Sequence, residues 1–141
     1  MITQAIGSTR SQLIGRSLIF ALGFLMLTLS ACGSAVSSKS PVEVQIAVSE
    51  FKFDSSLTTF SVGTPYRFVI TNKGALAHDW MIMPQGEIDE KKALIMVEDT
   101  ELLPGTSVTK EFTFTQPGNY EFACHVAGHY EAGMHLNILV K

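Results

Sequence analysis

The sequence lacks the features that mark several classes of protein. It has only two cysteines in 141 residues, Cys32 and Cys124, which excludes a disulfide-rich scaffold. It has no basic stripe, and its 10 basic residues are outnumbered by 13 acidic ones, so nucleic acid is not an expected partner. It has no internal repeat. Hydrophobic residues make up 46% of the chain and charged residues 16%, which is enough for the packed core of one domain.

Acidic residues are absent from the first 31 positions, which instead contain Arg10 and Arg16 and then the apolar run Ser17–Leu29. A basic start, an apolar centre and a small-residue end predict a secretory signal peptide. The alternative is a permanent transmembrane helix, but the run is shorter than the ~20 residues that a spanning helix needs. Without residues 1–31 the chain has 8 basic and 13 acidic residues, a net charge of −5.

The end of this segment, Leu29-Ser-Ala-Cys32, resembles the bacterial lipobox, in which the cysteine becomes the lipidated first residue of the mature protein. The alternative is a plain signal peptide that happens to end beside a cysteine. We therefore expect a signal peptide at 1–31, a lipidated Cys32 with a flexible tether to residue 41, and a globular domain at 42–141. The protein would then be exported and lipid-anchored on the outer face of a bacterial membrane, in the periplasm or at the cell surface.

From Val42 onward, apolar and polar residues alternate in short runs that are rich in β-branched and aromatic side chains. Glycine, proline and asparagine mark turns between these runs. Only residues 86–97 break the pattern, and a short helical or irregular insertion is expected there. The pattern predicts an all-β domain, a Greek-key antiparallel β-sandwich. The main strand-like runs are 42–48, 65–71, 108–114, 119–124 and 135–140.

If Cys32 carries a lipid, Cys124 has no intramolecular disulfide partner. It could form an intermolecular disulfide, lie buried as an inert thiol, or bind a metal. The segment Cys124-His-Val-Ala-Gly-His129-Tyr-Glu-Ala-Gly-Met134 favours the metal, because it places a thiolate, an imidazole and a thioether on one loop between two predicted strands. A second imidazole, His78, lies 46 residues upstream of the cysteine.

Two histidines, one cysteine and a weakly bound methionine are the ligands of a mononuclear type 1 (blue) copper site. Imidazole suits Cu(II), whereas thiolate and thioether suit Cu(I). A site that compromises between the two changes little on reduction, and this favours transfer of single electrons. The predicted ligands of one copper ion are His78, Cys124, His129 and Met134.

With this loop, the domain resembles the cupredoxin family, which includes plastocyanin, azurin, auracyanin and rusticyanin. Four residues between Cys124 and His129, and four between His129 and Met134, are closest to the auracyanin and rusticyanin spacing. The resemblance covers about Val42 to Lys141. It implies that the equivalent of His129 reaches the surface through an apolar patch, here expected around Ala127, Gly128, Tyr130, Ala132 and Gly133 with Ala75 and Leu76 as neighbours.

The chain departs from the family pattern at two positions. Asp79 follows the first histidine where the family usually has Asn, whose side chain helps to tie the two ligand loops together. Ala127 stands where a proline is frequent. An ionised Asp79 would favour Cu(II) and lower the reduction potential. The extra backbone N–H of Ala127 could point toward the sulfur and oppose that effect.

Several other residues of these types are expected to have structural roles. His125 and His135 neighbour ligands in sequence, and alternation along a strand predicts that both face solvent. Met81 and Met83 fall on one face of a strand and are expected to pack in the core, as is Trp80.

These features predict an electron carrier that acts as a monomer, not an enzyme. By analogy with the family, its partners would be a c-type cytochrome or a respiratory or photosynthetic membrane complex. The alternative is an exported copper-binding protein for copper storage, delivery or resistance. A copper enzyme needs a second domain and more histidine ligands, and a binuclear copper centre needs two cysteines in the ligand loop.

Overall fold

The computed structural model describes residues 39–141. The predicted signal peptide, the lipidation site Cys32 and most of the predicted tether lie outside the described residues. No helix within 39–141 is long and apolar enough to cross a membrane.

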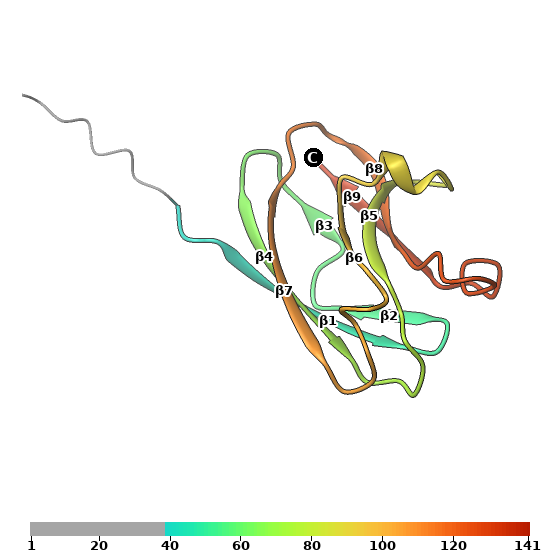
Figure 1. Cartoon of the computed structure of the whole chain (residues 1–141). Coiled ribbons are helices and arrows are strands. Elements are labelled where there is room, and N and C mark those ends of the chain that lie inside the picture. The colour runs from blue at the N-terminus through green and yellow to red at the C-terminus, as the bar shows by residue number, and fades with distance from the viewer. Residues whose placement is uncertain (1–38) are drawn as a thin grey trace, which may run out of the picture. The chain divides into compact units, whose positions relative to one another are not determined.

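The domain is a sandwich of two β-sheets (Figure 1). The first sheet has the strand order β2-β1-β4-β7 and the second has the order β3-β9-β8-β5-β6. This confirms the predicted sandwich, with the difference that both sheets are mixed: β1 pairs with β4, and β3 with β9, in parallel. The elements are β1 (Val42–Ser49), β2 (Lys52–Ser55), β3 (Thr59–Phe60), β4 (Pro65–Asn72), β5 (Trp80–Pro84), the 3-10 turn η1 (Glu90–Lys92), β6 (Ile95–Val97), β7 (Ser107–Thr113), β8 (Gly118–Ala123) and β9 (His135–Val140).

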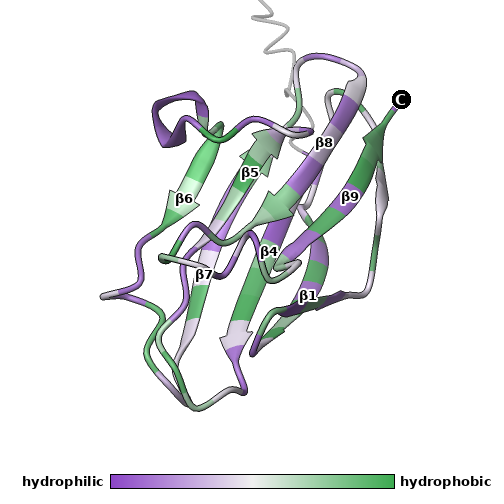
Figure 2. Cartoon of the chain, turned by 90° about the vertical axis from the view of Figure 1, so that its right-hand side faces the viewer, coloured by the Kyte–Doolittle hydropathy of each residue, from purple (hydrophilic) through white to green (hydrophobic). Residues whose placement is uncertain are grey.

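The core lies between the sheets because apolar residues alternate along the strands that face each other. Figure 2 shows this alternation in the hydropathy of β8 and β9. In β4 the inward residues Phe68 and Ile70 are fully buried, and the aromatic rings of Phe68, Trp80 and Phe122 pack against one another. Trp80 is therefore a core residue, as predicted.

The second sheet is covered on its outer face as well. Residues 81–83 of β5 and 121–123 of β8 are buried without alternation, and they run through the middle of the sheet. Met81 and Met83 are buried as predicted, but in a second cluster on the outer face, together with Ala123 and the half-buried Met96 and Tyr130. The predicted insertion at 86–97 holds η1 and then β6, which pairs with β5. The short β6 was missed because the charged residues before it hide its pattern.

Candidate metal centre

Three of the predicted ligands meet at one end of the sandwich. The Nδ1 atoms of His78 and His129 are 3.2 Å apart, and the Sγ atom of Cys124 is 3.4 Å from Nδ1 of His129. The three donor atoms all lie within 4.8 Å of one another, and all three residues are buried. Met134 is fully buried in the same core cluster as Cys124. Within residues 39–141 this is the one group of three or more His, Cys, Asp or Glu side chains close enough to hold a metal ion.

The loop from Cys124 to Met134 is closed by backbone hydrogen bonds between its ligand residues. Cys124 follows β8 and Met134 precedes β9, and these strands are antiparallel neighbours. The N–H of Cys124 donates to the carbonyl of Met134 (3.1 Å), and the N–H of Met134 donates to the carbonyl of His129 (3.0 Å). Gly128 and Gly133 adopt φ values of 82° and 97°, which side chains disfavour, so glycine suits these two turns. Figure 1 shows this loop in red at the right of the domain.

The loop that carries His78 is organised by Asn72, a buried residue at the end of β4. Its side-chain Nδ2 donates to the carbonyls of Leu76 (2.7 Å) and Leu102 (2.9 Å), while its Oδ1 accepts from the N–H of Gly74 (2.8 Å). The N–H of His78 donates to the carbonyl of Leu102 as well (3.3 Å). The sequence analysis treated asparagine only as one of the residue types that mark turns, whereas Asn72 is a buried amide whose three partners fix this arm of the site.

Asp79 joins the two arms. Both of its carboxylate oxygens accept from the N–H of His125, at 2.9 and 3.1 Å. The carboxylate therefore makes the tie between the ligand loops that the family resemblance assigns to Asn. Burial raises the pKa of Asp79, and hydrogen bonds from the His125 backbone and the Cys124 side chain partly oppose this shift.

A metal ion that binds here would displace the proton of the Cys124 thiol, whereas His78 has no extra proton to lose. Burial, followed by the neighbouring charge of Asp79, raises the pKa of the Cys124 thiol to about 12. Hydrogen bonds from the backbones of Val126 and Asp79 act in the opposite direction. The pKa of His78 is lowered, chiefly by burial and then by His129, so its imidazole is neutral and free to ligate.

This donor set fits copper. It combines two imidazole nitrogens and a sulfur, with a thioether buried in the same cluster, and it has no carboxylate among the three convergent donors. Ions such as calcium and magnesium prefer oxygen ligands. Zinc accepts histidine and cysteine but has no use for a thioether, whereas His₂Cys with a weak methionine is the copper arrangement.

One edge of the site lies just below the surface. His129 is 8% exposed, and the ring of Phe51 stands edge-on to it, with 5.3 Å between the ring centroids and 89° between the ring planes. Phe51 itself is 45% exposed. Leu76, which was expected next to the patch, is 48% exposed. Ala127 and Gly128 are exposed, as expected for a surface patch around His129. Sequence reasoning missed Phe51, which comes from the distant β1–β2 turn.

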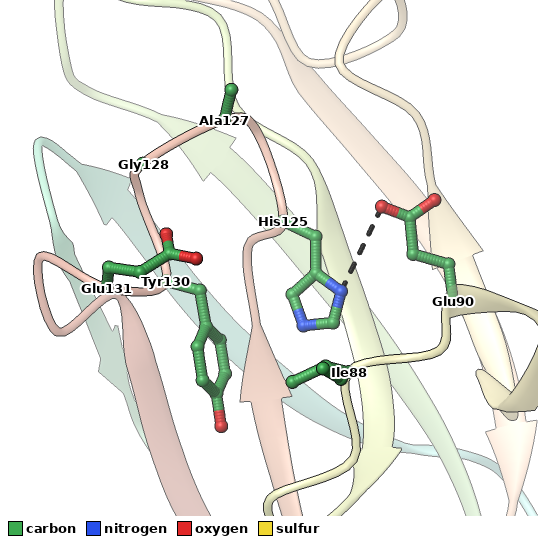
Figure 3. Close-up of a pocket in the computed structure, with 7 residues that line it drawn as sticks. All are labelled: Ile88, Glu90, His125, Ala127, Gly128, Tyr130 and Glu131. Carbon is green, nitrogen blue, oxygen red and sulfur yellow. Dashed lines mark ion pairs between the residues drawn. The ribbon is translucent and has the colours of Figure 1, made fainter.

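The prediction for Tyr130 was wrong. Its hydroxyl donates to the carboxylate of Glu121 (2.8 Å) on the outer face of β8, so its side chain turns away from the patch around His129. The prediction for His125 was wrong too. Its side chain is only 8% exposed, because it packs edge-on against Tyr130 and lies 3.9 Å from Glu90 (Figure 3). His135 is exposed, as predicted.

A pocket of about 270 Å³ lies beside the ligand loop, where His125 and Tyr130 turn outward (Figure 3). None of the predicted copper ligands lines it, so it is separate from the three convergent donors. Its lining residues are Ile88, Glu90, His125, Ala127, Gly128, Tyr130 and Glu131.

Comparisons with known proteins agree with this site. Residues 40–141 match the sequence profile of a family described as copper binding proteins, plastocyanin/azurin family. The chain is 27% identical over 115 residues to the copper-resistant cuproprotein CopI of Rubrivivax gelatinosus, covering 74% of this chain and 70% of that protein. It is 27% identical over 146 residues to the minor plastocyanin isoform of Arabidopsis thaliana, covering 99% of this chain and 82% of that protein. Among solved structures, it resembles dithionite-reduced auracyanin from Roseiflexus castenholzii, with a TM-score of 0.58 and 24% identity over 72% of this chain and 98% of that one.

Proposed function

Because the chain belongs to the plastocyanin/azurin family of copper-binding proteins, we propose that it holds one copper ion with His78, Cys124, His129 and Met134 and carries single electrons. The observation that carries the proposal is the convergence of buried imidazole and sulfur donors at one end of the sandwich. When bound, copper supplies a one-electron couple between Cu(I) and Cu(II).

The surrounding residues favour electron transfer because they fix the two chain segments that carry the donors. Asn72 fixes the arm that carries His78, and Asp79 ties that arm to the loop that carries the other donors. The backbone bonds between His129 and Met134, and between Met134 and Cys124, close this loop. A site that is held in this way in both oxidation states needs little rearrangement when an electron arrives or leaves.

The surface beside His129 supports brief contact with a redox partner. Phe51, Leu76, Ala127 and Gly128 are exposed there and carry no charge. Small apolar patches suit weak encounters that exchange quickly. We propose a c-type cytochrome or a respiratory or photosynthetic membrane complex as the partner. We also propose that the protein works outside the cytoplasm, tethered through a lipid on Cys32.

A role in copper resistance is the second candidate, because the similar protein of Rubrivivax gelatinosus is named for it. A protein that delivers copper is expected to present thioethers at its surface. Within residues 39–141 the four methionines are buried or half-buried, which favours the electron carrier. A copper enzyme would need a second metal site, and the described part of the chain groups such side chains at one place only.

The test is an absorption spectrum of the chain from residue 33 onward, titrated with Cu(II) and then reduced. An intense visible band at one copper per chain, bleached reversibly by reduction and absent in Cys124→Ser, is the expected result. Rapid mixing of the reduced protein with an oxidised c-type cytochrome should then restore the band. A pale product would favour the resistance role. A blue protein would favour it too if it exchanged electrons with no partner and if copper-sensitive cells needed the protein to survive copper.

A further inference from the structure

Each predicted ligand is followed in the sequence by a residue that belongs to a second layer of contacts. These four residues are Asp79, His125, Tyr130 and His135. Asp79 accepts from the backbone of His125. The ring of Tyr130 lies between the rings of His125 and His135, with centroid distances of 5.1 and 5.0 Å. While Cys124 and Met134 face the main core, Tyr130 packs against the second cluster on the outer face of the sheet.

A buried carboxylate lies beneath this layer. Glu121 is only 1% exposed and sits on β8, three residues before Cys124. Its Oε1 accepts from the hydroxyl of Tyr130 (2.8 Å) and from the N–H of Gly86 (3.1 Å), and its Oε2 lies 3.9 Å from Nδ1 of His135. Removing a carboxylate from water is costly unless hydrogen bonds replace the lost hydration. Two of the three groups beside Glu121 come from residues that directly follow ligands, namely Tyr130 after His129 and His135 after Met134.

Tyr130 is also the first residue of the turn between His129 and Met134. Its own carbonyl accepts from the N–H of Gly133 (2.9 Å), and the preceding carbonyl, of His129, accepts from the N–H of Met134 (3.0 Å). The backbone on both sides of Tyr130 is thus engaged in holding Met134 at its distance from His129. The side chain fixes the same residue to β8 through Glu121.

We propose that Tyr130, held by Glu121, is a positioning residue for the copper site. It anchors the turn between His129 and Met134 from the outer face of the sheet, so that the imidazole and the thioether keep their places whether or not copper is bound. The inference rests on the proposed ligand set. It adds a fixed point that is independent of the backbone bonds within the loop and of the tie made by Asp79.

The test compares single-atom changes. Tyr130→Phe removes only the hydroxyl, and Glu121→Gln keeps an acceptor for it but removes the charge. Tyr120→Phe is the matched control, because Tyr120 is also half-buried on β8 but its hydroxyl donates to the carbonyl of Gln116 in an exposed hydrogen bond. Three quantities are measured: amide hydrogen exchange of Met134 in the copper-free protein, copper affinity, and the charge-transfer bands and copper hyperfine splitting of the Cu(II) form.

Loss of an outer partner of a metal site commonly costs about ten- to a hundredfold in affinity. We expect Tyr130→Phe to weaken copper binding by that factor, to change the ratio of the charge-transfer bands, and to speed exchange of the Met134 amide. Glu121→Gln should have a smaller effect in the same direction, and Tyr120→Phe should resemble the wild type. A Tyr130→Phe protein that melts at a lower temperature but keeps the wild-type affinity, spectrum and amide exchange would overturn the proposal.

Failure of this inference can be told apart from failure of the proposed function. If the wild type exchanges electrons with no partner, the electron-carrier role fails, but affinity, spectrum and amide exchange still report on Tyr130. If the wild type fails to form a blue site, amide exchange in the copper-free protein still decides whether Tyr130 holds the turn. If the wild type is blue and transfers electrons while Tyr130→Phe matches it in all three measurements, only the positioning role is wrong.

Discussion

Phe51 provides the sharpest test of how the surface beside His129 controls access to the copper site. It is the one non-glycine residue with positive φ among residues 39–141, at 58°, and it remains 45% exposed. The turn that carries it is anchored by its neighbour Glu50, whose Oε1 accepts from the N–H groups of Ala75 (2.5 Å) and Leu76 (3.1 Å). The chain thus accepts backbone strain in order to place a half-exposed ring edge-on to His129.

The effect of Phe51→Gly on stability can be estimated from these contacts. Full burial of a phenylalanine contributes about 1.5–3 kcal/mol, so a side chain that is 45% exposed loses roughly 1 kcal/mol. The edge-on contact with His129 adds about 0.5–1.5 kcal/mol. Relief of the left-handed backbone returns about 1–2 kcal/mol, and the greater freedom of glycine in the unfolded chain removes about 0.5–1 kcal/mol of that. The net loss is about 1 kcal/mol.

We expect Phe51→Gly to change the rate of electron exchange at the copper site as well as the stability of the domain. A loss of about 1 kcal/mol lowers the melting temperature of a domain this size by about 4–8 °C. Removal of the ring uncovers the edge of His129, so we expect the reduced protein to be oxidised faster by a small inorganic complex, as measured by rapid mixing. Val62→Ala is the control, because Val62 is also an exposed apolar residue but lies by the C-terminal residue Lys141, away from the ligand loop.

Two outcomes would refute this reasoning. A loss of about 3 kcal/mol or more would mean that Phe51 behaves as a core residue. An oxidation rate equal to that of the wild type and of Val62→Ala would mean that the ring does not restrict access to His129.

The remaining predictions concern charge and the frame of the site. Asp79→Asn should lower the pKa of the Cys124 thiol, because the carboxylate raises that pKa; titration of the thiol in the copper-free protein measures this change. The same substitution should raise the reduction potential of the copper site, which voltammetry measures. Copper binding at pH 7 should release about one proton per chain, because the pKa of the Cys124 thiol is about 12. The apparent copper affinity should therefore rise about tenfold per pH unit. Titration calorimetry in buffers of different ionisation enthalpy counts the released proton. Asn72→Ala should destabilise the domain by about 2–4 kcal/mol in denaturant unfolding, because it leaves buried polar groups without partners.

Each of these predictions has a contradicting result. An unchanged potential in Asp79→Asn would mean that the carboxylate is already neutral beside the sulfur. Copper binding without proton release at pH 7 would mean that the Cys124 thiol is already ionised, or that another atom binds the metal. A loss of stability below about 1 kcal/mol in Asn72→Ala would mean that water replaces the amide. Asn72→Asp is the companion variant, because it keeps the acceptor for the N–H of Gly74.

The inner part of the site was predictable because it depends on local sequence. Cys124, His129 and Met134 lie within one loop, and the hydrophobic pattern on either side marks β8 and β9. Residue types alone then point to copper. His78 was harder, since only its position after a turn distinguished it, and the contact that places it comes from Asn72 and Leu102, which lie far apart in sequence.

The outer part of the site could not be predicted by the same reasoning. Alternation correctly sends the neighbour of a strand ligand to the opposite face, but it does not say whether that face meets water. For His125 it meets Tyr130 and Glu90, because the chain between β5 and β6 folds back over the second sheet. Phe51 escaped notice because an exposed aromatic residue in a turn has no sequence pattern that names its partner.

The spacing of the ligand loop links the two layers. Four residues separate Cys124 from His129 and His129 from Met134, so the residues that follow the ligands are spaced in the same way. With Cys124 and Met134 facing the main core, the positions after the loop ligands meet on the other side, where the rings of His125 (edge-on) and His135 contact Tyr130 above Glu121. A loop with a different spacing would move both sets at once. The outer layer thus constrains the length of the loop in addition to the metal, and an insertion of one residue between His129 and Met134 should disrupt the contact between Tyr130 and His135 together with the site.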